Sequence, residues 1–344
     1  FKNGVVDINS LKIMPHSPEY GFRGILPYDF NKNATCPTFE WFISDILLGD
    51  QNLIKIVQEF MGYVVRGGEY KYHKALWLAG SGRNGKSTLL DIIRALIGEG
   101  NYSSLSIKQI TQDKFASEKL DGKLANFSEE TSPDDLSDSS IFKNLTSGGY
   151  VDAQRKYGDL YSFKNKAKLI MTYNEIPLLK DLSHGMLARP IIIPFKKDLT
   201  DEGSQDKTLF PRLLEELSGI FMWAMEGYVR LEEQGRFTSS EQSTESLNEI
   251  KEDSDSAFQW YSEHVELIDD LSYEYKAKEL YQHYLMYAGR YPLSEQKFYR
   301  RILSIREMKC RHRKTNKYQK YVSLKLSDLH TQDRSYAKNQ YYTN

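Results

Sequence analysis

The sequence lacks the features that define several large classes of protein. It has only two cysteines in 344 residues, Cys36 and Cys310, and neither has a Cys or His nearby at metal-ligand spacing. A disulfide framework and a zinc site are therefore poorly supported. No apolar run approaches the roughly 20 residues that a membrane span needs. The chain opens on Phe1 without a targeting signal, so we expect an intracellular protein, without membrane partners, that is part of a longer chain.

Net charge is also nearly absent, at −1, but the charge is unevenly distributed. The segment from Lys297 to Lys325 holds eleven Lys or Arg residues and one acidic residue, Glu307. This asymmetry indicates one basic surface for a polyanion on an otherwise acidic body. The alternative is a solvated charged face, which is the usual role of a charge run.

The pattern of apolar residues changes near residue 70. Before it, the chain shows short strands and loops followed by apolar residues at helical spacing. After it, "ALWLAG", "KLANFSE" and "KAKLIMTYN" are predicted to be buried strands, and "KSTLLDIIRALIG" a helix. Strands that alternate with helices predict an α/β core with a mainly parallel sheet.

The strongest motif is "GSGRNGKST", which satisfies G-x-x-x-x-G-K-S/T between a predicted strand and a predicted helix. Glycines let backbone N–H groups wrap phosphates, Lys86 meets the β and γ phosphates, and Ser87 takes a magnesium ion. The alternative is a glycine-rich turn with a chance lysine. We expect ATP and Mg²⁺ as cofactors, held by Gly80, Ser81, Gly82, Arg83, Asn84, Gly85, Lys86, Ser87 and Thr88.

Hydrolysis needs further groups, and three short segments offer them. Glu129 and Glu130 end a predicted strand, where one acid would hold magnesium and the other would activate water. Asn174 ends another strand and is a candidate γ-phosphate sensor, and Arg189 is a candidate finger toward a neighbouring subunit's nucleotide. The alternatives are an acidic turn that caps a helix, a turn asparagine and a surface arginine.

Two regions carry candidate DNA contacts. "YVDAQRKYGDLYSF" alternates around a glycine turn as a hairpin does, with Arg155, Lys156 and Tyr157 at the tip. Near the end, three predicted helices precede two predicted strands with a turn at 315–317, which is a winged-helix arrangement. Its candidate phosphate contacts are Lys297, Arg300, Arg301, Arg311, Arg313 and Lys314. A solvated hairpin tip and a solvated charged face are the alternatives.

In this order and spacing, the motifs resemble the superfamily 3 helicases, and within them the C-terminal helicase part of primase–helicases from phages, plasmids, satellite elements and poxviruses. The resemblance covers most of the chain, from "NGVVDI" and "LPYDF" to "MLARPIIIPF". It implies a ring, usually a hexamer, with ATP between neighbouring subunits and single-stranded DNA in the channel. It also implies the roles given above to Lys86, Ser87, Glu129, Glu130, Asn174 and Arg189, and to the hairpin tip. The resemblance further implies an upstream primase or polymerase domain and a setting in the host cytoplasm.

We therefore expect an ATP hydrolase that acts as a DNA helicase on single-stranded and fork DNA during replication of a mobile element. Two other functions would use the same nucleotide site. One is an initiator or loader that remodels DNA without unwinding it. The other is a DNA-binding regulator whose assembly is switched by nucleotide without productive turnover. A small-molecule kinase would leave the hairpin and the basic tail unexplained. The expected fold is α/β, with an AAA+-like P-loop NTPase core. The expected regions are 1–70 (loops, helical layer and candidate collar), 71–200 (ATPase core), 201–250 (helical segment and linker) and 251–344 (winged-helix-like basic domain).

Overall fold

The structure is a computed structural model that divides into two compact units, Phe1–Ile250 and Lys251–Asn344, and each is described by itself. None of the helices in the described part of the chain combines the length and hydropathy that a bilayer span requires. The described residues are 1–129, 136, 139–174, 177, 179, 181–199, 206, 208–266, 274–288, 292–304, 321–323 and 325–326.

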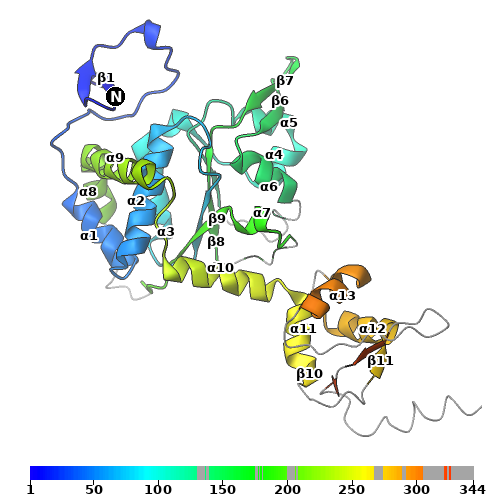
Figure 1. The fold of residues 1–344 in the computed structure, drawn as a ribbon. Coiled ribbons are helices and arrows are strands. Elements are labelled where there is room, and N and C mark those ends of the chain that lie inside the picture. Colours follow the sequence, from blue (N-terminus) through cyan, green and yellow to red (C-terminus); the bar gives the residue numbers. More distant parts are fainter. Residues whose placement is uncertain are drawn as a thin grey trace, which may run out of the picture. The chain divides into compact units, whose positions relative to one another are not determined.

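A five-stranded parallel sheet forms the centre of the first unit (Figure 1). Its strand order is β4-β5-β8-β3-β9, and every neighbouring pair is parallel. This confirms the predicted α/β core and its parallel sheet. Strand β4 was not predicted, because two residues are too short to show a pattern. The strands span Ala75–Ala79 (β3), Tyr102–Ser103 (β4), Ala125–Ser128 (β5), Lys168–Tyr173 (β8) and Pro190–Pro194 (β9).

One face of the sheet packs on a layer of helices from both ends of the unit (Figure 1). Leu76 and Leu78 of β3 point into this core, as period-two alternation requires. The predicted helical layer before residue 70 is two helices, because Gly49 adopts a left-handed φ of 74° and Asp50 caps the second helix. The helices are α1 (Pro37–Ile46), α2 (Gln51–Arg66), α3 (Lys86–Ile97), α8 (Leu209–Glu215) and α9 (Leu217–Gln234).

The opposite face packs on shorter helices and a hairpin. Trp77 of β3 points to this side and lies 5.9 Å from the ring of Phe142. Strands β6 (Tyr150–Gln154) and β7 (Leu160–Lys164) pair antiparallel, which confirms the predicted hairpin. The helices are α4 (Ile107–Gln112), α5 (Lys114–Glu118), α6 (Ser139–Thr146) and α7 (His184–Leu187).

The ends of the first unit also have defined structure. Phe1 packs edge-on against Tyr28 and Phe221, so the start of the chain is fixed on α9. The remaining elements are the β1–β2 hairpin (Val5–Asp7, Lys12–Met14), the 3-10 turns η1 (Pro18–Tyr20) and η2 (Glu99–Asn101), and α10 (Glu241–Asp253), which runs past the unit boundary.

The second unit has its own aromatic core. The rings of Tyr284 and Phe298 stack at 4.3 Å, with Trp260 edge-on to Phe298. Strand β11 pairs with β12 and β10 with β13, both antiparallel. The turn predicted at 315–317 lies outside the described residues, so the winged helix stays a prediction. The elements are α11 (Ser256–His264), β10 (Val265–Glu266), β11 (Glu274–Lys276), α12 (Ala277–Tyr287), α13 (Glu295–Ser304), β12 (Tyr321–Ser323) and β13 (Lys325–Leu326).

The packing of α2 on α9 gives a test of the first unit. A Cβ atom at Gly62 would lie 2.1 Å from the carbonyl oxygen of Ala224. We expect Gly62→Ala to lower the free energy of unfolding by about 1–3 kcal/mol, because overpacking outweighs the gain in helix propensity. Urea unfolding measures this. Gly100→Ala is the control, since nothing lies within 4 Å of its added Cβ. Equal stability of the two variants would contradict the close packing of α2 on α9.

Candidate functional site

The loop from Gly80 to Ser87 joins the carboxyl end of β3 to α3. Gly80, Gly82 and Gly85 have positive φ angles of 155°, 95° and 90°, which explains the glycines of the motif. Arg83 also has a positive φ, of 44°. The N–H of Gly80 donates to the carbonyl of Tyr173 at 3.1 Å, which attaches the loop to the end of β8. The loop thus lies at the N-terminus of α3, whose first N–H groups have no partner within the helix.

Lys86 is held by the loop itself. Its Nζ donates to the carbonyl of Gly80 and to Asn84 Oδ1, the latter at 3.2 Å. Asn84 in turn donates from Nδ2 to the carbonyl of Phe195 at 3.4 Å. Burial lowers the pKa of the Lys86 ammonium. An anion that enters the loop would offer this buried charge a stronger partner than the two neutral oxygens.

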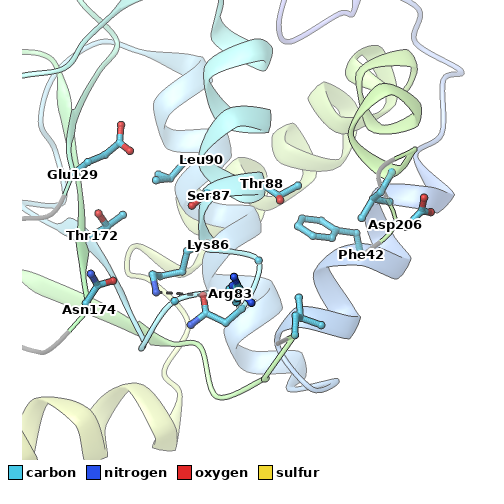
Figure 2. A pocket seen from close by; sticks show the side chains of 15 residues that line it. Phe42, Arg83, Lys86, Ser87, Thr88, Leu90, Glu129, Thr172, Asn174 and Asp206 are labelled. Atoms are coloured by element: carbon cyan, nitrogen blue, oxygen red, sulfur yellow. Dashed lines mark hydrogen bonds between the residues drawn. The ribbon is translucent and has the colours of Figure 1, made fainter. Parts of the chain in front are cut away.

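A pocket of about 490 Å³ opens beside the loop (Figure 2). It brings together most of the nucleotide-site residues predicted from the sequence: Gly82, Arg83, Asn84, Gly85, Lys86, Ser87, Thr88, Glu129 and Asn174. Gly80 and Ser81 belong to the same loop but do not line the pocket. The sequence prediction missed Phe42, Leu90, Thr172, Leu199, Asp206 and Leu209. Thr172 was detectable, since it is a polar residue in an apolar strand two positions before Asn174.

Strand register explains how Glu129 and Asn174 reach one pocket. Ser128 of β5 pairs with Met171 of β8, so Glu129 follows beside Thr172. Ala79 of β3 pairs with Tyr173, so Asn174 follows beside the start of the loop. The carboxyl ends of parallel strands meet at one edge of the sheet, where open α/β folds bind ligands. Glu130 lies outside the described residues.

Glu129 is paired with an arginine that the sequence analysis did not single out. Its Oε1 forms an ion pair with Nη2 of Arg94, and Nη1 of Arg94 contacts Asp91 Oδ1 at 3.0 Å. The guanidinium also lies over the ring of Phe127, 4.7 Å from its centroid. Burial opposes the charge of Arg94, but its hydrogen bonds to Glu129 and Asp91 raise its pKa. In Figure 2 the Glu129 carboxylate points away from Lys86.

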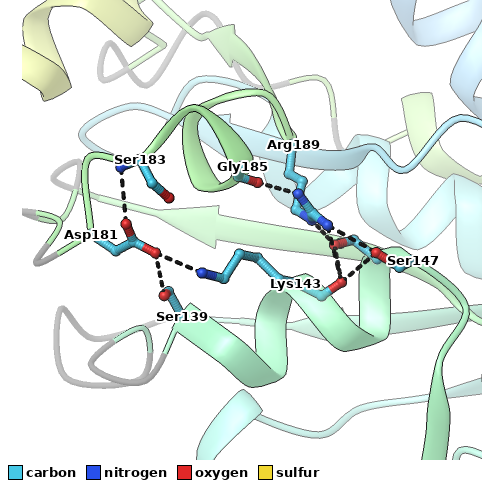
Figure 3. A network of polar contacts seen from close by, with 8 residues as sticks. Ser139, Lys143, Ser147, Asp181, Ser183, Gly185 and Arg189 are labelled. Atoms are coloured by element: carbon cyan, nitrogen blue, oxygen red, sulfur yellow. Dashed lines mark hydrogen bonds and ion pairs between the residues drawn. The ribbon is translucent and has the colours of Figure 1, made fainter.

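Arg189 does not line the pocket, and its guanidinium is engaged within the chain (Figure 3). Nε donates to Thr146 Oγ1 at 2.8 Å and Nη2 to Ser147 Oγ at 2.9 Å. Nη1 donates to the carbonyl of Gly185. Arg189 therefore ties the end of α6 to α7. A role on a neighbouring subunit's nucleotide requires these bonds to exchange.

A second charged pair lies beside Arg189 (Figure 3). Lys143 Nζ contacts Asp181 Oδ2 at 2.8 Å, and the hydroxyl of Ser139 donates to the same oxygen at 2.5 Å. Partial burial opposes ionisation of Asp181, but the hydrogen bonds from Lys143, Ser139 and Ser183 hold its pKa well below the usual range. The Asp181 carboxylate therefore stays charged at neutral pH and fixes the turn before α7.

The tip of the β6–β7 hairpin carries two exposed candidates for DNA contact. Tyr157 is 95% exposed, and the Nζ of Lys156 lies 5.3 Å from its ring centroid. Lys156 forms no ion pair with any described residue. Arg155 is placed differently, since its Nε lies 3.5 Å from Glu118 Oε1 and its guanidinium lies over the ring of Tyr161. The structure thus leaves the cation and the aromatic ring at the tip accessible to solvent.

The basic residues of the second unit also divide into two kinds. Lys297 and Arg300 of α13 are exposed. Arg301 forms an ion pair with Asp255, a buried residue that caps α11 by accepting from the N–H of Phe258 at 3.1 Å. Arg301 therefore joins α13 to α11. Arg311, Arg313 and Lys314 lie outside the described residues.

Parts of the chain match known families and proteins. Residues 78–189 match a family of unknown function, DUF5906, and residues 1–48 match a family described as D5 N terminal like. A helicase-like protein of Acanthamoeba polyphaga mimivirus is 29% identical over 126 residues. That match covers 34% of this chain and 13% of the viral protein's length.

Solved structures share the fold. Three apo structures of the C-terminal region of NrS-1 match with TM-scores of 0.55, 0.51 and 0.53 at 14%, 14% and 13% identity. Each match covers 88% of this chain and 79% of the other. At 13–14% identity these matches show a likeness of fold alone.

The bonds of Arg189 generate a stability test. We expect Arg189→Ala to lower the free energy of unfolding by about 1–3 kcal/mol, because it removes charged hydrogen bonds that join α6 to α7. Chemical denaturation measures this. The exposed Arg23→Ala is the control, with an expected change within about 0.5 kcal/mol. If Arg189→Ala unfolds at the same denaturant concentration as the unaltered chain, the guanidinium is not anchored in this way.

Proposed function

We propose, from the sequence motifs and the similarity to a helicase-like viral protein, that the chain is an ATP-dependent DNA helicase for a phage, plasmid or other mobile element. It would translocate on single-stranded DNA as a ring, with superfamily 3 architecture and ATP sites between subunits. The observation that carries the proposal is strand β8. Its C-terminal end presents Thr172 and Asn174 to the pocket, and its N-terminal end follows directly on the β6–β7 hairpin.

The pocket fits a nucleoside triphosphate with magnesium. Gly82 and Gly85, which both have positive φ, line with Lys86 and the N-terminus of α3 a space large enough for a phosphate chain. Mg²⁺ would neutralise charge on the β and γ phosphates. The ion would be held by the exposed Ser87 hydroxyl and by the carboxylates of Glu129 and Glu130. Lys86 would leave the Gly80 carbonyl and Asn84 to meet the phosphates.

The acidic residues and Asn174 would have different roles in hydrolysis. Glu129 lines the pocket but must turn from Arg94 toward Lys86 before it orients or deprotonates water beside the phosphates. Asn174 lies beside the loop and supplies an amide that distinguishes the presence of a γ-phosphate from its absence. A change at Asn174 would reach β8, which is paired along both sides.

The other end of β8 is firmly attached to the hairpin. Lys168 is fully buried and donates to the carbonyl of Gly68 at 2.9 Å, and burial lowers its pKa to about 7. Lys164 of β7 pairs with Glu69 at 2.5 Å. The turn at residues 68–69 therefore contacts both the hairpin and β8. This rigid base supports transmission of movement from the pocket to Lys156 and Tyr157 at the tip.

The proposed partners follow from the exposed groups. Lys156 and Tyr157 offer a cation for phosphate and a ring for a base, which is how single strands are held without sequence preference. Lys297 and Arg300 of the second unit would add phosphate contacts to fork DNA. Arg189 would act across the ring, which is a hexamer by resemblance to the superfamily 3 helicases, after release from α6 and α7.

The test is displacement of a labelled strand from a tailed DNA duplex with ATP and Mg²⁺. We expect Lys86→Ala to lose both ATP hydrolysis and displacement. Lys156→Ala should keep hydrolysis and slow displacement about tenfold or more, equivalent to losing roughly 1.4 kcal/mol of DNA contact. Lys166→Ala, an exposed lysine outside the tip, is the matched control and should unwind normally.

Other outcomes would redirect the proposal. DNA-stimulated hydrolysis without displacement, even in assembled rings, would replace the helicase with a loader or initiator. Absence of ATP hydrolysis under all conditions would leave a nucleotide-controlled DNA-binding protein. Normal displacement by Lys156→Ala would remove the hairpin tip from the mechanism.

A further inference from the structure

Lys168, at the point where the β6–β7 hairpin leads into β8, is a fully buried lysine. Its Nζ donates to the carbonyl oxygens of Gly68 and Lys166 at 2.9 Å each and to that of Glu69 at 3.3 Å. An ammonium has three N–H donors, so every donor has an oxygen. These oxygens are backbone dipoles without a full charge, and they offset only part of the cost of burying the ammonium.

The partners of Lys168 come from two separate parts of the first unit. Lys166 belongs to the link between β7 and β8, whereas residues 68–69 form the turn after α2. The ring centroids of Tyr63 on α2 and of Tyr70 in the same turn lie 4.5 Å and 4.8 Å from Nζ. Ring faces attract a cation. One buried side chain therefore joins the helical layer before residue 70 to the base of the hairpin.

Lys168 changes its charge near neutral pH. Burial lowers its pKa to about 7, while the charge of Glu69 raises the pKa and that of Lys166 lowers it. The Glu69–Lys164 pair beside it stays ionised, because their hydrogen bond lowers the pKa of the acid and raises that of the lysine. Burial raises the pKa of both tyrosine hydroxyls that face Lys168. As the pH rises through about 7, Lys168 loses its charge and its neighbours keep theirs.

We propose that Lys168 is a positioning residue that fixes the base of the hairpin as a pivot, so that a shift at the pocket end of β8 moves the tip. This rests on the proposed function, in which the tip contacts single-stranded DNA. The buried charge lowers stability, but its three bonds and two ring contacts select one geometry of the base. The neutral amine has one donor fewer and is not attracted to the rings as a cation is. Coupling of ATP hydrolysis to strand displacement therefore depends on the charged form.

The experiment measures the base pairs displaced per ATP hydrolysed by the full chain, from about pH 6 to about pH 9, on either side of the Lys168 titration. The unaltered chain should lose coupling by about threefold as the pH rises, as the loss of one hydrogen bond allows. Lys168→Met keeps an unbranched buried side chain without the charge. It should hydrolyse ATP normally and show the low coupling at every pH. Equal coupling of the two chains across this range overturns the proposal.

Two exposed residues of the turn after α2 identify the group that titrates. Glu69→Gln removes the acid that raises the pKa of Lys168, so the midpoint of the coupling profile should move to lower pH. His73→Asn is the matched control, because asparagine tolerates the positive φ of 55° at this position, and it should leave the midpoint unchanged. A midpoint that moves with His73→Asn and not with Glu69→Gln assigns the pH dependence to another group, and the proposal is then wrong.

Stability provides a readout that requires no helicase activity. In the unfolded chain an ordinary lysine titrates near about pH 10.4, so above about pH 7 the unfolded chain binds the proton that folded Lys168 has lost. Stability then rises with pH. In urea unfolding between about pH 8 and about pH 10, the unfolding equilibrium constant of the unaltered chain should fall about tenfold per pH unit relative to that of Lys168→Met. A ratio that does not change with pH would place the amine in water and overturn the buried pivot.

The outcomes separate this inference from the function on which it rests. If the unaltered chain displaces strands with a coupling that does not change with pH, the proposed function stands and the role of Lys168 is wrong. If the unaltered chain displaces no strand, the proposed function fails and the role of Lys168 in coupling fails with it.

Discussion

The pairing of β8 between β3 and β5 is the constraint on which the rest of the candidate site depends. All six residues of β8 are buried, and its register with both neighbours is defined along most of its length. A slip by one residue would turn Thr172 and Asn174 to the opposite face of the sheet. The same pairing brings Glu129 beside Thr172 and the start of the glycine loop beside Tyr173. One strand therefore sets the geometry of groups from three distant parts of the sequence.

The reactive groups share a second property, since each is held by the chain itself. Lys86 contacts Gly80 and Asn84, Glu129 contacts Arg94, and Arg189 contacts the end of α6. Half-buried charges need partners, and a protein supplies them from within. A ligand then has to replace existing bonds. In the proposed function, each step of nucleotide or DNA binding would in this way be coupled to a local rearrangement.

The helices before residue 70 take part in the site as well as in the core. Ile46 of α1 packs directly against the position of Gly85, where a Cβ would lie 2.6 Å from its side chain. Phe42 lines the pocket, and Asp45 pairs with Lys197 beyond β9. These contacts explain why the segment that matches the D5 N terminal like family contributes to the same pocket as the glycine loop.

The sequence alone determined the elements with strong local signals. An apolar run defined β3, short strand patterns with polar residues among the apolar ones defined β5 and β8, the glycine spacing defined the loop, and alternation around Gly158 defined the hairpin. These patterns depend on neighbours along the chain. Only the tertiary structure decided the order of the strands, the pairing of Glu129 with Arg94 and the bonds of Arg189. Phe42 and Leu209 reach the pocket by helix packing, although neither is near the glycine loop in sequence and Leu209 follows it by more than a hundred residues. Contacts of this kind leave no periodic signal, because each depends on where two separate surfaces meet.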